Sequence, residues 1–367
     1  VTVNQVPPVP DAGGNGTINC TQIQPIQLGA SPVTGYGYAW SPATGLSANN
    51  IANPTANPNA TTNYTLTVTD INNGCTATDA VTVTVSNTAP VVDALVVGGQ
   101  TTVCAGSSIT LYGTGANTYT WSNGVINNQA FVPSATATYT VTGVNTTNGC
   151  QSTDVITITV NPIPTVAPIQ SIVLCAGSQT PNIAFVGSVP GTTFSWTNTD
   201  PSINLVASNT SNSIAPFTVT NNTAQPKVAT ITVTPIYTFN GLPCAGTPQT
   251  FTITVNPIPT VNAVNSSGVC HGTTVAAINF ASSFGVANTI YTWTNSNQNI
   301  GLGTGATGNI PAFSATNAGT APISGTISVT PSASNAGLSC SGTTITFVLT
   351  VNPIPTVNSI ASQVVCN

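Results

Sequence analysis

The stretch Val-Asn-Pro-Ile-Pro-Thr-Val occurs three times in this sequence, at residues 160–166, 255–261 and 351–357. The first Val of each copy is the last residue of an alternating run of Thr and apolar residues. This alternation is the pattern of a strand with one face in a core. Successive copies lie 95 and 96 residues apart. A period of this length predicts an array of whole small domains, with the stretch as the joint between them.

Two prolines in each joint fix φ, and the residue before each proline is driven toward an extended conformation. We therefore expect a stiff connection, unlike a flexible Gly/Ser linker. Four sandwiches with strands of about 8–10 residues would make a rod of about 120–160 Å. The inter-domain joint residues are Pro162, Pro164, Pro257, Pro259, Pro353 and Pro355.

The fold class that we predict is all-β, a tandem array of Ig-like or PKD-like β-sandwich domains that forms an elongated rod. Short strands at regular spacing, rich in Thr and Val, favour this class. The predicted domains are two short repeats, two long repeats and the start of a fifth: residues 1–86, 87–160, 161–255, 256–351 and 352–367.

Each repeat has one Trp, on an alternating run that also holds a Tyr or Phe two residues earlier. Side chains two apart on a strand share a face, so each pair of rings is expected in the core. A sugar-stacking role for these rings is the alternative interpretation. The four predicted core residues are Trp40, Trp121, Trp196 and Trp293.

Nine cysteines are distributed as two per repeat, with Cys366 as the first of the fifth. Paired cysteines in small β domains indicate disulfides and an oxidising, extracellular setting. We expect each bridge to pin loops at one end of its own sandwich and to stabilise it by about 4 kcal/mol. The predicted pairs are Cys20–Cys75, Cys104–Cys150, Cys175–Cys244 and Cys270–Cys340, and Cys366 is expected to pair outside this segment.

Composition excludes several function classes. Charged residues make up 2% of the chain, with one Lys or Arg in total. A single cation cannot neutralise nucleic-acid phosphates or bind an anionic membrane surface, so we expect no nucleic-acid partner. No apolar run reaches the length of a membrane span, and we expect no direct membrane insertion.

Catalytic chemistry has few residues to work with, and we predict no enzyme and no cofactor. The only histidine, His271, lies in the fourth repeat, which has no Asp or Glu, so a Ser-His-Asp site cannot form there. The one candidate metal site is a weak Ca²⁺ site that uses Asp70 and Asp79. Solvated strand-end acids or turn formers are the other interpretation of these two residues.

Three features carry a resemblance to a known repeat class. They are Trp40-Ser-Pro-Ala-Thr-Gly-Leu-Ser47, the run Tyr64-Thr-Leu-Thr-Val-Thr-Asp70 followed by Asn73-Gly-Cys75, and the joints. They resemble the PKD-like and Ig-like repeats of giant secreted surface proteins of gliding Bacteroidetes. The resemblance implies type IX secretion, attachment to the outer cell surface and adhesion. The chain departs from the PKD pattern, because the run Trp-Asp-Phe-Gly-Asp-Gly is missing.

The leading functional hypothesis is a non-enzymatic extracellular stalk segment of a repetitive bacterial cell-surface adhesin that supports attachment and gliding motility. Its expected partners are other repeats of the same chain, surface polysaccharide and other cell-surface proteins. Two alternatives stay open: carbohydrate- or protein-binding β-sandwich modules, and a self-assembling surface filament subunit.

Overall fold

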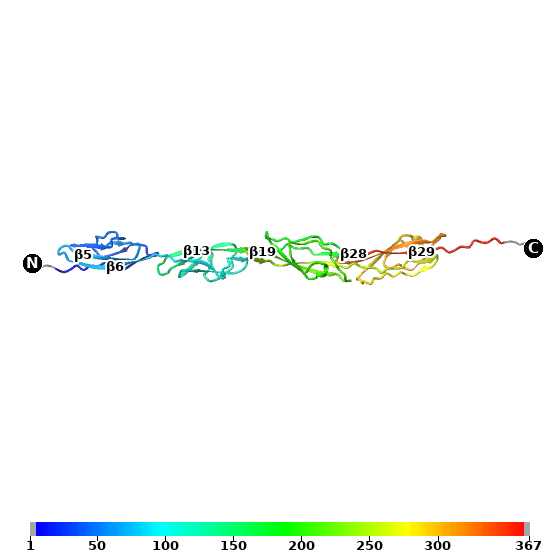
Figure 1. Cartoon of the computed structure of the whole chain (residues 1–367), viewed down its shortest axis with the longest axis horizontal. Coiled ribbons are helices and arrows are strands. Elements are labelled where there is room, and N and C mark those ends of the chain that lie inside the picture. The colour runs from blue at the N-terminus through cyan, green and yellow to red at the C-terminus, as the bar shows by residue number, and fades with distance from the viewer. Residues whose placement is uncertain (1–4, 363–367) are drawn as a thin grey trace, which may run out of the picture. The chain divides into compact units, whose positions relative to one another are not determined.

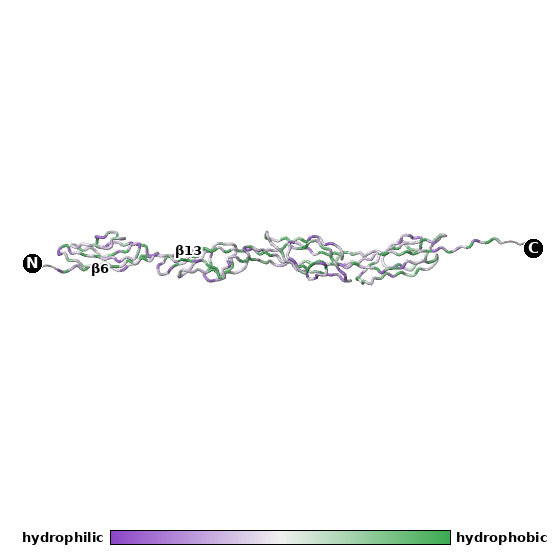
Figure 2. The backbone as a smooth tube through the Cα atoms, in the orientation of Figure 1, coloured by the Kyte–Doolittle hydropathy of each residue, from purple (hydrophilic) through white to green (hydrophobic). Residues whose placement is uncertain are grey.

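Strands make up nearly all regular structure in the computed structural model, which describes residues 5–362. The chain divides into two compact units, Val1–Pro162 and Ile163–Asn367. Figure 1 follows the strands along the chain, and Figure 2 shows apolar and polar residues alternating along them. The fold is thus an all-β array of sandwiches, as predicted from the sequence. None of the helices in the described part is long and apolar enough to span a membrane.

The first repeat contains a four-stranded sheet in the order β1-β6-β5-β3 and a two-stranded sheet of β2 and β4. The long hairpin β5–β6 is visible in Figure 1 and buries alternate residues such as Tyr64, Leu66 and Val68. The strands are β1 (Gly16–Asn19), β2 (Ile26–Gln27), β3 (Tyr36–Ser41), β4 (Thr55–Ala56), β5 (Thr62–Asp70) and β6 (Thr76–Ser86).

The second repeat has sheets ordered β10-β12-β13-β8 and β11-β9-β7. Its hydrophobic cluster lies between residues 92 and 160 and includes Leu111 and Val141. Its elements are β7 (Asp93–Val96), β8 (Thr102–Cys104), β9 (Ile109–Thr114), β10 (Thr118–Trp121), the 3-10 turn η1 (Ser122–Gly124), β11 (Ala130–Phe131), β12 (Ala137–Val144) and β13 (Gln151–Asn161).

The third repeat is larger because β19 continues past the sheet and folds back on β20. The main sheet runs β14-β21-β19-β16-β17, and β15 pairs with β18. Its elements are β14 (Ile172–Cys175), β15 (Ile183–Ala184), β16 (Thr193–Asn198), η2 (Pro201–Ile203), β17 (Ser208–Thr210), β18 (Ser213–Ile214), β19 (Lys227–Phe239), β20 (Leu242–Ala245) and β21 (Gln249–Asn256).

The fourth repeat repeats this plan, with the sheet β22-β29-β27-β24-β25, the extra hairpin β27–β28 and the pair β23–β26. Its elements are β22 (Ser267–Cys270), β23 (Thr274–Val275), β24 (Ile290–Asn295), η3 (Gln298–Ile300), β25 (Gly305–Thr307), β26 (Phe313–Ser314), β27 (Ile323–Asn335), β28 (Leu338–Ser341) and β29 (Ile345–Asn352).

One feature of the topology positions the cysteines. In every repeat the short strand before the first cysteine pairs in parallel with the last strand, near the end from which the chain leaves. Asn19 faces Ser86 in the first repeat, and Cys175 faces Asn256 in the third. The first cysteine of a repeat therefore lies at its exit end, next to the joint.

The four Trp side chains are buried, with 3–9% of their surface exposed, and each belongs to the hydrophobic cluster of its own repeat. Three indole N–H groups donate to acceptors: Ile51 O, Asn127 Oδ1 and Ser211 Oγ. In the described chain the Nε1 of Trp293 is buried without an acceptor. These rings fill cores, and none of them offers a face for sugar stacking.

Candidate functional site

The second cysteine of each repeat lies at the end of the sandwich opposite the first. Cys75 directly precedes β6, an 11-residue strand, whereas Cys20 lies beside the far end of that strand. At about 3.3 Å per residue the two are about 36 Å apart. A disulfide needs Cα atoms within about 7 Å, so Cys20 and Cys75 cannot pair in the folded repeat.

The disulfides join neighbouring repeats instead. Cys20 of the first repeat is bonded to Cys150 of the second, with Cα atoms 4.9 Å apart. Cys175 of the third repeat is bonded to Cys340 of the fourth, with Cα atoms 5.6 Å apart. Both bridges follow one rule, in which the first cysteine of a repeat is joined to the second cysteine of the repeat that follows.

These bonds correct all four pairs predicted inside single repeats. Cys20–Cys75 and Cys104–Cys150 are wrong because Cys20 takes Cys150, and Cys175–Cys244 and Cys270–Cys340 are wrong because Cys175 takes Cys340. Cys104 and Cys244 are each in a disulfide, and Cys75 and Cys270 are free thiols. The predicted outside pairing of Cys366 lies beyond the described residues.

The same separation of the two cysteines exists in the long repeats. In the fourth repeat Cys270 faces Asn352 at the exit end, whereas Cys340 faces Ala333 near the turn of β27–β28. Ile323, at the start of β27, faces Val351, so the turn lies about ten residues, or about 33 Å, from the exit end. The expectation that a bridge pins loops at one end of its own sandwich is therefore wrong.

Hydrogen bonds and close packing support the Cys20–Cys150 bridge. The Cys20 N–H donates to Asn148 O at 3.1 Å, across the boundary between the repeats. The buried Asn148 side chain donates to Thr88 O in the connecting segment at 3.0 Å. A Cβ built on Gly149 would lie 2.2 Å from Thr21 Cγ2, so a larger residue here would force the Thr21 side chain to move. The junction is a packed interface as well as a covalent one.

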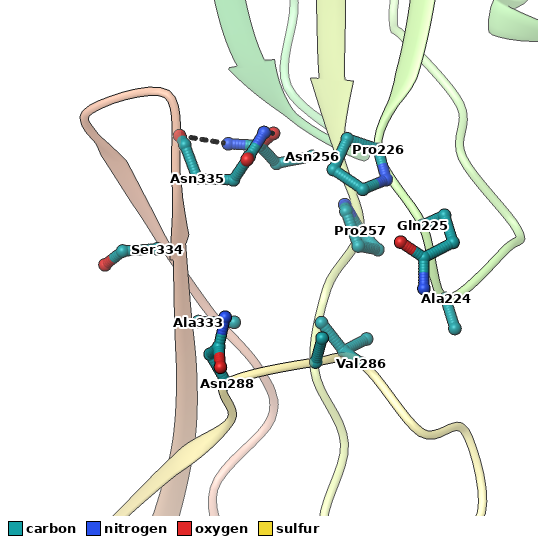
Figure 3. A pocket seen from close by; sticks show the side chains of 11 residues that line it. Ala224, Gln225, Pro226, Asn256, Pro257, Val286, Asn288, Ala333, Ser334 and Asn335 are labelled. Atoms are coloured by element: carbon teal, nitrogen blue, oxygen red, sulfur yellow. Dashed lines mark hydrogen bonds between the residues drawn. The ribbon is translucent and has the colours of Figure 1, made fainter.

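An asparagine pair accompanies the Cys175–Cys340 bridge. Asn256, from the joint, donates to Asn335 O at 2.9 Å and accepts from Asn335 Nδ2 at 2.8 Å (Figure 3). Asn256 is 2% exposed, and strand β14 contacts β28 across the same boundary. A buried amide with both ends paired specifies one relative register of the surfaces that it joins.

In the joints at 161–166 and 256–261, the second proline packs against the repeat that follows. A Cβ at Gly342 would lie 1.9 Å from Pro259 O and 2.8 Å from Pro331 Cγ. Gly246 makes the equivalent close approach to Pro164 O. Val166 and Val261, which end these two joints, lie in the next hydrophobic cores. In the joint at 256–261, only Pro257 and Ile258 thus lie between Asn256, at the end of β21, and Pro259, which packs against the fourth repeat.

A hollow of about 180 Å³ lies beside this joint, lined by residues of both the third and the fourth repeat (Figure 3). Its lining consists of small, apolar and amide side chains, among them Pro226, Pro257, Val286, Asn288 and Ser334. None of the lining residues is ionisable, so the hollow offers neither acid–base chemistry nor charged recognition.

The two predicted calcium ligands do not converge. Asp79 faces Leu66 across the hairpin, four residues along β5 from Asp70, so their positions are about 13 Å apart. Asp70 Oδ1 accepts from the Asn72 N–H, whereas Asp79 Oδ2 accepts from the Ala12 N–H at 2.7 Å. No group of three or more His, Cys, Asp or Glu that could hold a metal lies in residues 5–362. Both carboxylates thus accept hydrogen bonds from backbone N–H groups: Asp70 in the turn after β5, and Asp79 from the segment before β1.

Asp154 and His271 have similar structural roles. Asp154 Oδ2 accepts from the Ala94 N–H at 2.8 Å, and this bond, with a second from the Val155 N–H, lowers the pKa of the carboxyl below its usual value. His271 Nδ1 accepts from the Asn317 N–H at 2.9 Å, beside the loop that carries Cys270. Both side chains thus accept hydrogen bonds from backbone N–H groups.

No protein-family model matches the chain, and no curated protein matches it either. Among solved structures it is similar to immunoglobulin domains 1–4 of Sidekick-1, at 12% identity and a TM-score of 0.29, with 96% of this chain and 98% of that one covered. It is also similar to EC1–4 of Drosophila N-cadherin, at 10% identity and 0.32, with 94% and 99% covered. Three N-terminal domains of the bacteriophage RB49 outer capsid protein Hoc match at 15% identity and 0.34, with 73% and 99% covered.

Sequence reasoning missed the inter-repeat bridges, although a signal for them was present. The short strand before each first cysteine needs a partner, and in Ig-like sandwiches with parallel first and last strands that partner is the last strand. The second cysteine, in contrast, precedes the last strand. This assignment alone would have placed the two cysteines of each repeat at opposite ends.

Proposed function

We propose that this chain is a non-enzymatic, load-bearing stalk segment of an extracellular adhesin. The observation that carries the proposal is the pair of bridges between neighbouring repeats, Cys20–Cys150 and Cys175–Cys340. A disulfide inside a domain stabilises that domain, whereas a disulfide between domains transmits tension past both of them. The use of disulfides also fits an oxidising, extracellular compartment.

The covalent path of force supports this role. In a chain held at its two ends, tension passes from residue 20 to residue 150 and from residue 175 to residue 340 through sulfur. The bypassed segments correspond to sequence separations of 130 and 165 residues. Fully extended, these would add about 450 and 580 Å to the length of the chain. With the bridges intact, loss of a core cannot release this length.

The joints and the motif around Trp40 are the support for a bacterial surface adhesin of the gliding Bacteroidetes type, exported by type IX secretion and anchored outside the outer membrane. The stalk would hold an adhesive part away from the cell, and that part would bind surface polysaccharide or another surface protein. The stalk would be an extended rod of repeats that end at residues 86, 160, 255 and 351.

Single-molecule force spectroscopy on the whole chain, held by handles at its ends, tests the load-bearing role. We expect the oxidised chain to show no extension steps as large as one repeat. The same molecule in dithiothreitol should show steps of roughly 250–350 Å, the length of 75–95 extended residues. Domain-sized steps in the oxidised chain would refute the proposal. Binding of the oxidised chain to a glycan array would instead favour a carbohydrate-binding module.

A further inference from the structure

Two cysteines among residues 5–362 are free thiols. Cys75 is the second cysteine of the first repeat, and Cys270 is the first cysteine of the fourth. Cys270 is exposed and Cys75 is partly so. Under the rule that the two bridges follow, Cys75 would require a preceding repeat and Cys270 a following one.

The loop around Cys75 is built like the loop around bonded Cys150. In each, the cysteine N–H donates to the Asn side chain two residues earlier, at 2.8 Å for Cys75 and 3.0 Å for Cys150. In each, the glycine before the cysteine donates back four residues at 2.7 Å, to Asp70 O and to Asn145 O. The side chain of Asn73 also donates to the segment that leads into its repeat, at Val6 O, as Asn148 does at Thr88 O.

The difference between the two loops is the presence of a neighbour. At Gly149 the Cβ position is occupied by Thr21, the residue after Cys20 of the preceding repeat. At Gly74, which has nearly the same φ, nothing lies within 4 Å of that position. The Cys75 loop therefore has the same structure as one side of the Cys20–Cys150 junction, but no repeat packs against it among the described residues.

The loop around Cys270 is built like the loop around bonded Cys175. The residue after the cysteine donates to the joint asparagine at 2.9 Å in both, Ala176 to Asn256 O and His271 to Asn352 O. Asn256, with a following repeat against it, is 2% exposed and paired with Asn335. Asn352, its counterpart beside Cys270, is exposed. Cysteine and asparagine together form the surface that faces a following repeat at the third–fourth junction.

We propose that Cys75 and Cys270 are covalent docking sites for further repeats of the same class. Cys270 bonds to the second cysteine of a following repeat, whose hairpin also supplies an asparagine for Asn352. Cys75 bonds to the first cysteine of a preceding repeat. Each bond forms from two thiols, which lose two protons and two electrons to a small-molecule disulfide such as oxidised glutathione.

Extending the chain by one repeat tests the Cys270 site. Residues 1–351 are followed by a second copy of residues 256–351, which preserves the joint, because residues 352–357 repeat residues 256–261. Thr274→Ser and Thr343→Ser in the added copy, both at exposed positions, mark its peptides by mass. The protein is oxidised with a glutathione pair, alkylated with iodoacetamide and mapped without reduction.

In residues 1–351 without the added copy, we expect alkylation at Cys75 and Cys270. In the extended chain Cys270 should be protected and bonded to the added counterpart of Cys340, and the added counterpart of Cys270 should be alkylated. With Cys270→Ser in the extended chain, the added counterpart of Cys340 should become alkylated. Continued alkylation of Cys270 in the extended chain, or its glutathionylation, would overturn the proposal.

The inference extends the proposed stalk function and can fail separately from it. The same map reports the Cys20–Cys150 and Cys175–Cys340 bonds in every sample. If these are present and Cys270 stays free, the load-bearing array stands and the docking sites are refuted. If these two bonds are missing, the proposed function loses its support as well.

Discussion

Single polar contacts in the cores differ between repeats that otherwise share a plan. Trp196 Nε1 donates to Ser211 Oγ at 3.0 Å, and that hydroxyl donates on to Ser213 O at 2.7 Å. In the fourth repeat the equivalent backbone position is Gly308, which donates to Tyr291 O as Ser211 donates to Phe194 O. Glycine has no hydroxyl, and this explains why the buried Trp293 N–H lacks an acceptor.

Replacing Ser211 with Ala should destabilise the third repeat by about 1–3 kcal/mol, because it leaves a second buried indole N–H unpaired. Hydrogen exchange read by mass spectrometry can assign the loss to peptides of residues 161–255. The fourth repeat serves as an internal reference, and Ser208→Ala, at an exposed position of β17, is the matched control. Unchanged protection in Ser211→Ala would show that the hydroxyl contributes nothing to the core.

At the scale of elements, the turn before Cys150 lies at the contact between the first and second repeats. Gly149 and Gly74 have φ of 70° and 73°, a region that costs alanine about 1–2 kcal/mol. Only Gly149 also faces another repeat, through Thr21. The two glycines are therefore a matched pair: alanine would cost both the same backbone strain, but only at Gly149 would it meet another repeat.

We expect Gly149→Ala to weaken the Cys20–Cys150 bond and Gly74→Ala to leave it unchanged. The measurement is the dithiothreitol concentration at which Cys20 and Cys150 become half-alkylated in each variant. A shift of about 5- to 10-fold toward lower concentration in Gly149→Ala corresponds to about 1 kcal/mol or more of lost packing. Equal midpoints in the two variants would mean that the bridge does not depend on this contact.

Elements and cores could largely be predicted from local sequence patterns, whereas the partners of the cysteines depend on how distant strands pair. Alternation along Tyr64–Thr69 specifies a strand and its buried face, because both are local properties. The partner of Cys20 is decided by the parallel register of β1 on β6, which is a non-local property. Counting two cysteines per repeat captured the period and assigned the wrong partners, since either order of pairing satisfies the same spacing. The two acids Asp70 and Asp79 could likewise be singled out in the sequence, whereas the backbone N–H groups that donate to them could not.

At the scale of the whole molecule, the stiffness of the joint at residues 256–261 cannot be attributed to proline alone. From the sequence, the stiffness of this joint was expected to come from Pro257 and Pro259. The structure adds a disulfide, a paired asparagine and the packing of Pro259 against Gly342 at the same joint. These contacts hold the third and fourth repeats at several separate points. A hinge would therefore have to break the bridge as well as loosen the backbone.

Replacing both Pro257 and Pro259 with Gly should change the solution dimensions of the chain little while Cys175–Cys340 is intact. Cys175→Ser with the prolines kept should also have a small effect, because the asparagine pair and the joint remain. Combining the three substitutions should free the junction and lower the radius of gyration measured by small-angle scattering. A large decrease from the proline substitutions alone, with the bridge confirmed by non-reducing mapping, would return the control of stiffness to the prolines. An equal decrease from Cys175→Ser alone would assign it to the disulfide.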